Sequence, residues 1–388
     1  MSESGLKNIP LRALLAGSRC KQIGLIQLAR KLVQSESPSN VKAAVDACIA
    51  LAASRAKQID GRIRVHRQHH FGDVLEVRFG PRRKVSSAKK PLLLLGHLDT
   101  VWPLGTIERM AWRVEKERLW GPGVLDMKAG VAMALTAIEL LIDAELLKQE
   151  IVLLLNGDEE IGSPASRPII EELARQCEAV YVLEPAQGLA YKTARKGIGN
   201  WQIEVKGIAA HSGVDFEKGA NAIREMARLV EKVSGWTDLQ RGLTVNVGVI
   251  DGGTKSNVVP AAARAEVDVR IARRADGPRI TRRFSTLKPT DPRCSLAITG
   301  GIDRPPMERS RGTVRLFRKA QEYARGLGFQ LDEASTGGAS DGNLTAALGI
   351  PTLDGMGAVG EGAHASHESV CIEHLAPRTA LLAAMLVD

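Results

Sequence analysis

Three apolar runs that each lead into acidic or imidazole side chains constrain the fold of this chain most. The runs cover residues 91–95, 151–155 and 179–183. Each has the length and composition of a strand that is buried on both faces, as in a parallel sheet. The side chains that follow them are His97 and Asp99, Glu159 and Glu160, and Glu184. Because ligands bind beyond the carboxyl ends of such strands, the pattern predicts a site at this edge of the sheet.

Two further segments carry side chains of the same kinds. A glycine-bent loop at residues 121–128 places Asp126 before a predicted helix, and residues 362–368 contain His364. Catalytic zinc binds imidazole nitrogen and carboxylate oxygen, whereas structural zinc sites typically use cysteine. The five cysteines show no paired short spacing. We therefore predict a dinuclear zinc cage with Asp126 as the shared carboxylate. Its ligands are His97, Asp126, Glu160, Glu184 and His364.

Two other acidic residues of these segments are predicted to assist the ligands. Asp99 follows His97 by two residues, so at a strand end both side chains point to the same side. We expect the Asp99 carboxylate to accept the second ring N–H of His97 and to fix its tautomer. Of the adjacent pair Glu159 and Glu160, one carboxylate must remain available to take a proton from water.

Taken in order along the chain, these motifs resemble the zinc aminoacylase and glutamate carboxypeptidase family of metallopeptidases, which also contains deacetylases and desuccinylases. The resemblance covers nearly the whole chain. It implies that His97 and Glu184 hold one zinc and that Glu160 and His364 hold the other. It also implies that Asp126 bridges the two ions and that Glu159 is the general base. In this family the peptide bond after the bridging aspartate, here Asp126–Met127, is often cis.

The last motif contains two histidines that compete for the role of ligand. In the family pattern, the ligand histidine is followed four positions later by an acidic residue. His364 and Glu368 satisfy this spacing. His367 is the alternative ligand, and the pattern favours His364.

The chain is predicted to contain two domains, because 388 residues exceed the roughly 250–300 at which single cores stop growing. The fold class is α/β: residues 1–195 and 306–388 form a catalytic domain, a mostly parallel sheet with helices on both faces. Residues 196–305 form an inserted α+β domain. Its predicted β-α-β-β-α-β order is typical of a split-βαβ, ferredoxin-like sandwich. In the resembling family this domain covers the active site and pairs two subunits, so a homodimer is implied.

His211 lies in a loop directly after a strand of the inserted domain. A lone histidine is more often structural than catalytic. The resemblance reverses this preference, because family members present the matching histidine to the tetrahedral intermediate, often from the partner subunit. We therefore predict that His211 is catalytic, and the sequence leaves open whether it acts in its own subunit or in the partner.

Four residues are candidates for binding substrate. Arg270 is expected to bind a carboxylate with both arms of its guanidinium, and Asn257 is expected to donate from its amide. A salt-bridged surface arginine and an asparagine turn are the alternative interpretations. Arg304 lies near the place where the glutamate-releasing branch has an arginine for the side-chain carboxylate. At Gly338 the missing Cβ lets a ligand lie close to the backbone.

Composition excludes several other classes of protein. The formal net charge is +9 with basic residues dispersed along the chain and only 4% aromatics, which favours a solvated basic surface over nucleic-acid binding. No segment approaches the roughly 18 apolar residues of a membrane span, and we expect no secretory signal. Dispersed cysteines agree with free thiols in a reducing compartment. We therefore expect a cytoplasmic protein that binds neither nucleic acid nor membrane.

The predicted function is zinc-dependent hydrolysis of an amide bond by a metal-activated water, with Glu159 as general base. The substrate is a peptide or an N-acyl amino acid, and the product is a C-terminal amino acid, acidic in the glutamate-releasing branch. Two Zn²⁺ ions per subunit are expected, with Co²⁺ or Mn²⁺ as alternatives. The sequence around His97 and after Glu160 is more similar to the glutamate carboxypeptidase branch. The alternatives are an N-acyl-amino-acid deacylase of the acetylornithine or succinyl-diaminopimelate type and a zinc-holding binding protein without turnover.

Overall fold

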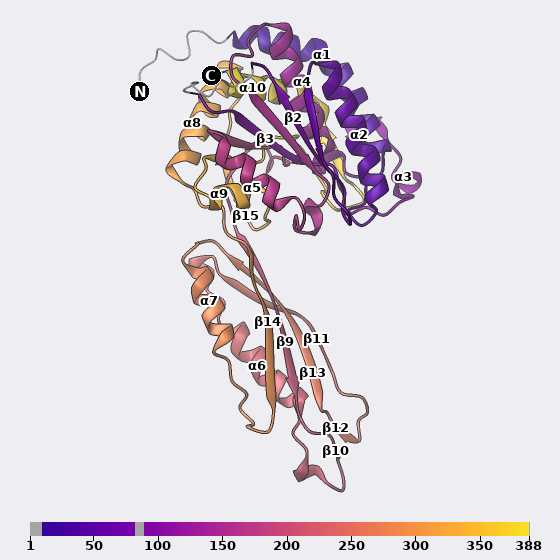
Figure 1. The fold of residues 1–388 in the computed structure, drawn as a ribbon, viewed down its shortest axis with the longest axis vertical. Coiled ribbons are helices and arrows are strands. Elements are labelled where there is room, and N and C mark those ends of the chain that lie inside the picture. Colours follow the sequence, from indigo (N-terminus) through magenta and orange to yellow (C-terminus); the bar gives the residue numbers. More distant parts are fainter. Residues whose placement is uncertain (1–9, 82–88, 388) are drawn as a thin grey trace. The chain divides into compact units, whose positions relative to one another are not determined.

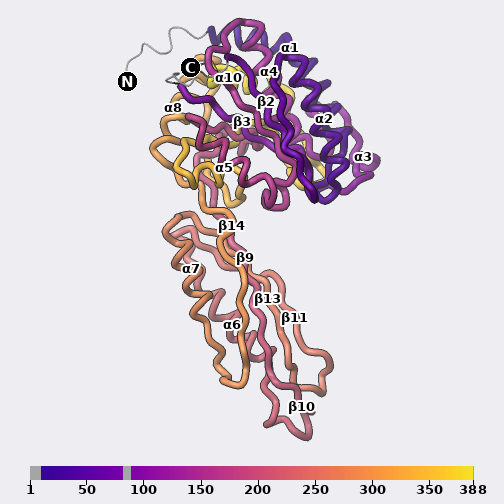
Figure 2. The backbone as a smooth tube through the Cα atoms, in the orientation of Figure 1, coloured from indigo at the N-terminus to yellow at the C-terminus, as the bar shows by residue number. Residues whose placement is uncertain are grey.

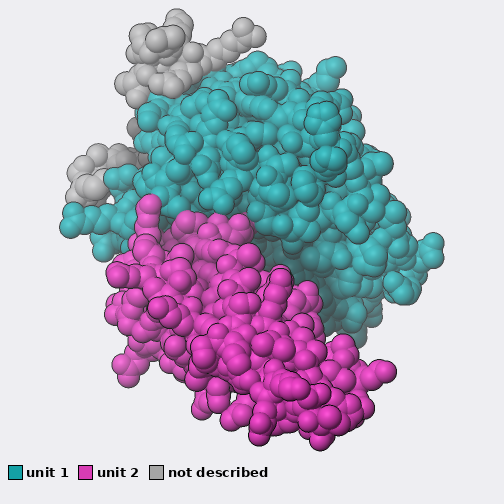
Figure 3. Space-filling view, turned by 60° about the horizontal axis from the view of Figure 1, so that its bottom comes forward, with its two compact units in different colours: residues 1–194, 309–335, 340–388 teal, residues 195–308, 336–339 magenta. Residues whose placement is uncertain are grey.

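The computed structural model describes residues 10–81 and 89–387. The chain forms two compact units, which Figure 3 shows in different colours. Unit 1 comprises residues 1–194, 309–335 and 340–388, and unit 2 comprises residues 195–308 and 336–339. Figures 1 and 2 follow the chain through both units.

Unit 1 is built on a six-stranded sheet in the order β1-β2-β6-β3-β7-β16. The strands are β1 (Arg62–His66), β2 (Val74–Phe79), β6 (Ile151–Asn156), β3 (Leu92–His97), β7 (Ala179–Val182) and β16 (Thr352–Leu353). The four strands from β6 to β16 are parallel, and β1 and β2 are antiparallel to their neighbours. Because Leu92 pairs with both Ile151 and Ala179, β3, β6 and β7 are in register and end at the same edge.

Helices cover both faces of this sheet, as Figure 1 shows. On one face, Leu92 and Leu94 belong to the same core as α1 (Leu11–Gln34), α4 (Ala129–Asp143) and α10 (Leu375–Val387). On the other face, Leu93 and Leu95 share a core with α5 (Arg167–Gln176) and α9 (Gly342–Ala347). Alternate leucines therefore feed different cores, which is why the run is apolar throughout. The predicted mostly parallel sheet with helices on both faces is confirmed.

The remaining elements of unit 1 surround this framework. The helices are α2 (Lys42–Gln58), α3 (Thr106–Arg109), α5 (Arg167–Gln176), α8 (Arg311–Gly326) and α9 (Gly342–Ala347). A second sheet has the order β17-β18-β5-β4, with β17 (Gly360–Glu361), β18 (Ser369–Cys371), β5 (Arg118–Trp120) and β4 (Arg113–Glu115). A two-stranded sheet pairs β8 (Tyr191–Arg195) with β15 (Glu333–Thr336).

Unit 2 is an antiparallel sheet with two helices, and it follows the predicted β-α-β-β-α-β order. Its elements are β9 (Gly197–Lys206), α6 (Ala222–Ser234), β11 (Thr244–Gly252), β13 (Ala262–Ile271), α7 (Asp276–Ser285) and β14 (Ser295–Arg304). The sheet order is β11-β13-β9-β14. Both helices belong to the core of this unit, where Phe284 of α7 stacks on Trp201 of β9 with ring centroids 4.4 Å apart. The short strands β10 (Ala210–His211) and β12 (Val258–Val259) pair with each other at one end of the unit 2 sheet (Figure 1).

Within residues 10–81 and 89–387, we find no helix whose length and apolar character would let it span a bilayer.

Candidate metal centre

The predicted ligands lie at the carboxyl edge of the unit 1 sheet. His97 is the last residue of β3, and Glu160 lies in a single turn of 3-10 helix (Glu159–Ile161) that follows β6. Glu184 comes two residues after β7. Asp126 lies in the short helical turn Val124–Lys128 before α4, and His364 lies between β17 and β18. Segments that are far apart in the sequence therefore meet at one edge.

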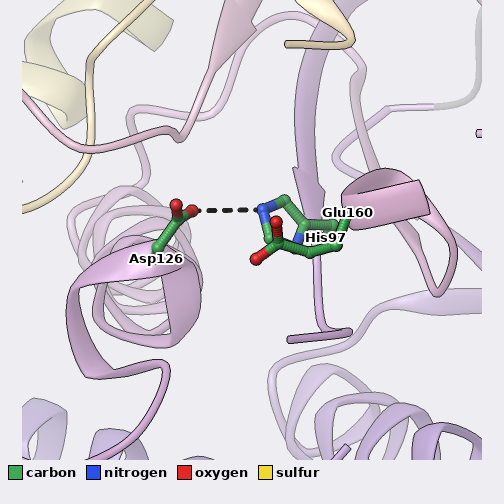
Figure 4. Close-up of side chains that lie close together, drawn as sticks. All are labelled: His97, Asp126 and Glu160. Carbon is green, nitrogen blue, oxygen red and sulfur yellow. Dashed lines mark ion pairs between the residues drawn. The ribbon is translucent and has the colours of Figure 1, made fainter. Parts of the chain in front are cut away.

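The structure brings these five side chains into contact in two groups that share Asp126. In the first group, Nε2 of His97 lies 3.3 Å from Oδ1 of Asp126 and 3.7 Å from Oε1 of Glu184. In the second group, Nε2 of His364 lies 3.4 Å from Oδ2 of Asp126 and 3.2 Å from Oε2 of Glu160. The two oxygens of one carboxylate therefore face two different imidazoles. Figure 4 shows His97, Asp126 and Glu160 at the centre of this arrangement.

The donor set fits a pair of divalent cations. Potential ligand atoms of His97, Asp126 and Glu160 lie within 4.8 Å of one another, and so do those of His97, Glu159 and Glu184. Oδ1 of Asp126 is buried, and Nε2 of His97 contacts it at 3.3 Å. Four carboxylates surround two imidazoles here, so neutral imidazoles would leave a net negative cluster that cations neutralise. Nitrogen and oxygen ligands of this kind suit zinc.

The carboxylates of the cluster raise the pKa values of both imidazoles. Hydrogen bonds to Asp126 and Glu160 raise the pKa of His364 to about 10. The pKa of His97 is raised well above its usual value; burial opposes this rise, and hydrogen bonds to carboxylates, first of all Asp126, outweigh burial. For Asp126, burial raises the pKa and the two histidines lower it, and the net direction is down. Burial raises the pKa of Glu160.

Asp99 contacts both His97 and the turn that carries the two glutamates. Nδ1 of His97 lies 3.0 Å from the backbone carbonyl oxygen of Asp99 and 3.4 Å from its carboxylate Oδ1. We expected the carboxylate to accept the ring N–H, but the shorter contact is to the carbonyl. The carboxylate accepts the backbone N–H groups of Glu159 and Glu160, at 3.2 and 3.1 Å, and the hydroxyl of Ser39, at 2.7 Å. Asp99 therefore fixes the turn that holds the glutamates.

The loop around His364 has an unusual backbone. His364 has a φ of +62°, which only a minority of non-glycine residues adopt, and Gly362 precedes it at +80°. His367 is exposed, and its ring and carbonyl lie against Gly362. Of the two candidate histidines, it is His364 that contacts Asp126 and Glu160. The peptide bond between Asp126 and Met127 is cis.

In unit 2, His211 and Asn257 lie together at the pair of β10 and β12. Nδ1 of His211 accepts a hydrogen bond from the backbone N–H of Gly213 at 3.1 Å, so the proton of the neutral ring sits on Nε2. The carbonyl of Asn257 accepts the N–H of Ser212 at 3.0 Å. Both His211 and Asn257 are exposed.

The other three candidates lie at the opposite end of the unit 2 sheet. Arg270 and Arg304 both pair with Ile198, near the start of β9. The guanidinium of Arg270 contacts Asp268 at 2.9 Å and the carbonyl of Gly337 at 3.4 Å. Arg304 is 4% exposed. The carbonyl of exposed Gly338 accepts a hydrogen bond from Arg195 at 3.3 Å.

Two buried residues beside the cage have roles that no motif in the sequence predicts. Ser39 donates to Asp99 from the loop between α1 and α2. Glu368 bonds to the turn that holds Asp126. The only sequence signal for Glu368 is its position four residues after His364.

Comparisons with known proteins identify relatives that agree with one another in kind. Residues 93–388 match the profile of Peptidase family M20/M25/M40. Carboxypeptidase G2 from Pseudomonas sp. (strain RS-16) is 32% identical over 306 residues, which cover 77% of this chain and 73% of that protein. Succinyl-diaminopimelate desuccinylase from Cereibacter sphaeroides (strain KD131 / KCTC 12085) is 29% identical over 324 residues, or 76% and 82% of the two chains. The crystal structure of aminopeptidase PepT from Bacillus cereus ATCC 10987 has a TM-score of 0.80 at 20% identity, covering 94% of this chain and 98% of that one.

Proposed function

Because the chain belongs to peptidase family M20/M25/M40, we propose that it is a two-zinc hydrolase that releases a C-terminal amino acid from a peptide or an N-acyl amino acid. The observation that carries the proposal is the position of Asp126, whose two carboxylate oxygens face His97 and His364 at 3.3 and 3.4 Å. A carboxylate placed in this way is suited to bridge two cations.

The proposed ligand sets follow the two contact groups. His97 and Glu184 would hold one ion, His364 and Glu160 the other, and Asp126 would be shared. Zinc is proposed because it accepts imidazole and carboxylate together and tolerates an open coordination position. Co²⁺ and Mn²⁺ are the alternatives for the same donors. When bound, two such cations supply a water of lowered pKa and polarise a substrate carbonyl.

Glu159 is proposed as the general base that takes a proton from the attacking water and returns it to the leaving nitrogen. Its carboxylate lies within 4.8 Å of ligand atoms of His97 and Glu184. Its backbone N–H is held by Asp99 at 3.2 Å, which limits the positions of the side chain. Both contacts support a proton-transfer role beside the ligands.

We infer that His211 acts in the active site of a partner subunit. Arg270 pairs with Ile198, near the start of β9. His211 comes after Lys206, the last residue of that strand. At about 3.3 Å per residue, the eight steps between Ile198 and Lys206 span roughly 26 Å. One small substrate cannot contact both side chains of the same chain. His211, with its proton on Nε2, is suited to donate a hydrogen bond to a developing oxyanion.

A homodimer would allow this division of residues, and strand β11 supports it. This strand lies at an edge of the unit 2 sheet, and it exposes Val249 and Ile250. Exposed apolar edge strands are prone to pair with another chain. We therefore propose that two copies associate through unit 2.

Arg270 is proposed to bind the carboxylate of the substrate, with Arg304 and Gly338 as further substrate-binding residues. Asn257, which lies beside His211, would contact the substrate from the partner subunit as His211 does. Arg270 already contacts Asp268, so a substrate carboxylate must compete with that partner. Arg304 is buried, so it would contribute to substrate binding mainly from the interior of unit 2. An acidic released residue is proposed from the similarity to carboxypeptidase G2. A cytoplasmic location is also proposed, because all five cysteines are free thiols.

The second candidate function is an N-acyl-amino-acid deacylase, which the similarity to succinyl-diaminopimelate desuccinylase favours. A screen of zinc-loaded protein against peptides and N-acyl amino acids that differ in their C-terminal residue separates the candidates. We expect the highest kcat/KM for substrates with an acidic C-terminal residue. Faster turnover of N-succinyl-diaminopimelate or N-acetylornithine would favour the deacylase. Full zinc content without any turnover would favour a binding protein.

A further inference from the structure

Glu368 forms a buried hub beside the candidate metal centre. Its side chain is 1% exposed, and each carboxylate oxygen accepts two N–H bonds. Oε1 accepts the backbone N–H groups of Leu125 and Asp126, at 2.9 and 3.1 Å. Oε2 accepts the backbone N–H of Gly123 at 2.8 Å and the indole N–H of Trp102 at 2.9 Å.

These four bonds connect three segments that carry proposed metal ligands. Glu368 itself lies in the loop of His364. Trp102 belongs to the segment that follows His97 at the end of β3, and the backbone donors belong to the turn of Asp126. A single carboxylate therefore connects the loop of His364 to two segments that lie more than 240 residues earlier in the sequence.

The turn of Asp126 needs such support, because it is not a regular helix. Asp126 has φ and ψ of −114° and 93°, and Met127 has −133° and 34°, both outside the helical region. The N–H groups of Leu125 and Asp126 bond to an acceptor outside the turn, Glu368, whereas the N–H of Lys128 bonds to the carbonyl of Gly123. A buried carboxylate is costly unless its oxygens are hydrogen-bonded, and those of Glu368 are used by the turn and by Trp102. No oxygen of Glu368 is left over for a metal.

We propose that Glu368 is a positioning residue, which holds Asp126 between the two metal sites by binding the backbone of its turn. The inference rests on the proposed two-metal function. Loss of one N–H acceptor lets the backbone of Asp126 shift, so both ions lose affinity at once. Removal of a partner that orients a ligand typically weakens metal binding by about 10–100-fold.

The test is the substitution Glu368→Gln in the full-length protein. Glutamine keeps the shape of the side chain but turns an NH₂ group towards two N–H donors, so two of the four bonds are lost. We expect Co²⁺ affinity, measured by competition with a chelator, to fall by about 10–100-fold for both ions. We also expect a changed visible spectrum of bound Co²⁺ and faster hydrogen exchange at Gly123, Leu125 and Asp126, with β3 and β6 unchanged.

Glu76→Gln is the matched control. Glu76 is also a buried carboxylate of unit 1, 3% exposed, and it pairs with His66 and Arg78 on the outer part of the sheet. This variant should lower Tm and leave Co²⁺ affinity and spectrum unchanged. If Glu368→Gln behaves in the same way, Glu368 is only structural and the proposal is overturned.

A milder substitution covers the case in which Glu368→Gln does not fold. Glu368→Asp keeps the charge and withdraws it by one methylene, so it should fold and bind Co²⁺ more weakly than the native protein. Unchanged Co²⁺ affinity in this variant would also overturn the proposal. The proposed hydrolase function is tested separately, on the native protein. If the native protein binds two Co²⁺ ions and hydrolyses no substrate, the hydrolase proposal fails while the positioning role is still decided by affinity.

Discussion

Metal binding should release about two protons per chain, because the metal-free cage keeps both of its imidazoles charged. The carboxylates of Asp126 and Glu160 raise the pKa of His364 to about 10. The pKa of His97 is also raised well above its usual value, against the effect of burial. At about pH 7.5, a pKa of about 10 corresponds to roughly 300 protonated rings for each neutral one. Since imidazole binds a metal only when it is neutral, both protons must leave.

Calorimetry measures this number directly. Protein stripped of metal is titrated with Zn²⁺ at about pH 7.5 in two buffers of different ionisation enthalpy, and the slope of the observed heat against that enthalpy gives the protons released. The variant His364→Ala should release about one proton fewer. A proton number near zero for the native protein would refute the reasoning, because it would mean that the histidines are already neutral or do not bind the metal.

The raised pKa of His364 also determines how the stabilities of the metal-free and the zinc-bound protein change with pH. In the metal-free protein, the raised pKa of His364 stabilises the folded state fully below about pH 6.5. This contribution is lost as the pH rises through about 10. With zinc bound the trend reverses, because fewer protons compete with the metal as the pH rises. The Tm values of the two forms should therefore diverge from about pH 6.5 to about pH 10. Parallel profiles would contradict the assignment of His364 as a ligand.

Three further predictions concern individual side chains. Glu159→Gln should keep both metals and lower kcat by about 10²–10⁴-fold. Glu160→Ala should lose metal as well as activity. Loss of metal from Glu159→Gln would instead make Glu159 a ligand. His211→Ala should lower kcat by about 10²–10³-fold with little change in KM. If His211 acts across a dimer, mixing this variant with Glu159→Gln should restore about a quarter of native activity, and no recovery would place it in its own subunit. Arg270→Ala should raise KM for substrates with a free α-carboxylate, and an unchanged KM would leave Arg270 as the ion-pair partner of Asp268.

The sheet edge that carries the candidate site was predictable because its signals are local. The leucines of β3 alternate between two cores, so the run is apolar throughout and identifies a strand buried on both faces. Parallel register then brings His97 and the residues after β6 and β7 to one edge. For Glu368, the spacing from His364 marks the residue but does not predict its contacts. Three of its four partners are backbone N–H groups, which every residue except proline carries, so no spacing of side chains reveals them.

The sequence could not decide in which subunit His211 acts, because the answer depends on the length of a strand and not on any motif. His211 and Arg270 are both predicted to contact substrate, yet β9 separates the ends of the unit 2 sheet at which they lie by roughly 26 Å. If both predictions hold, each substrate meets Arg270 from one chain and His211 from another. The dimer would then be the smallest active assembly. Activity per chain should therefore fall on dilution below the dimer dissociation constant while the metals stay bound. Constant activity in verified monomers would require that one of the two residues has no role in catalysis.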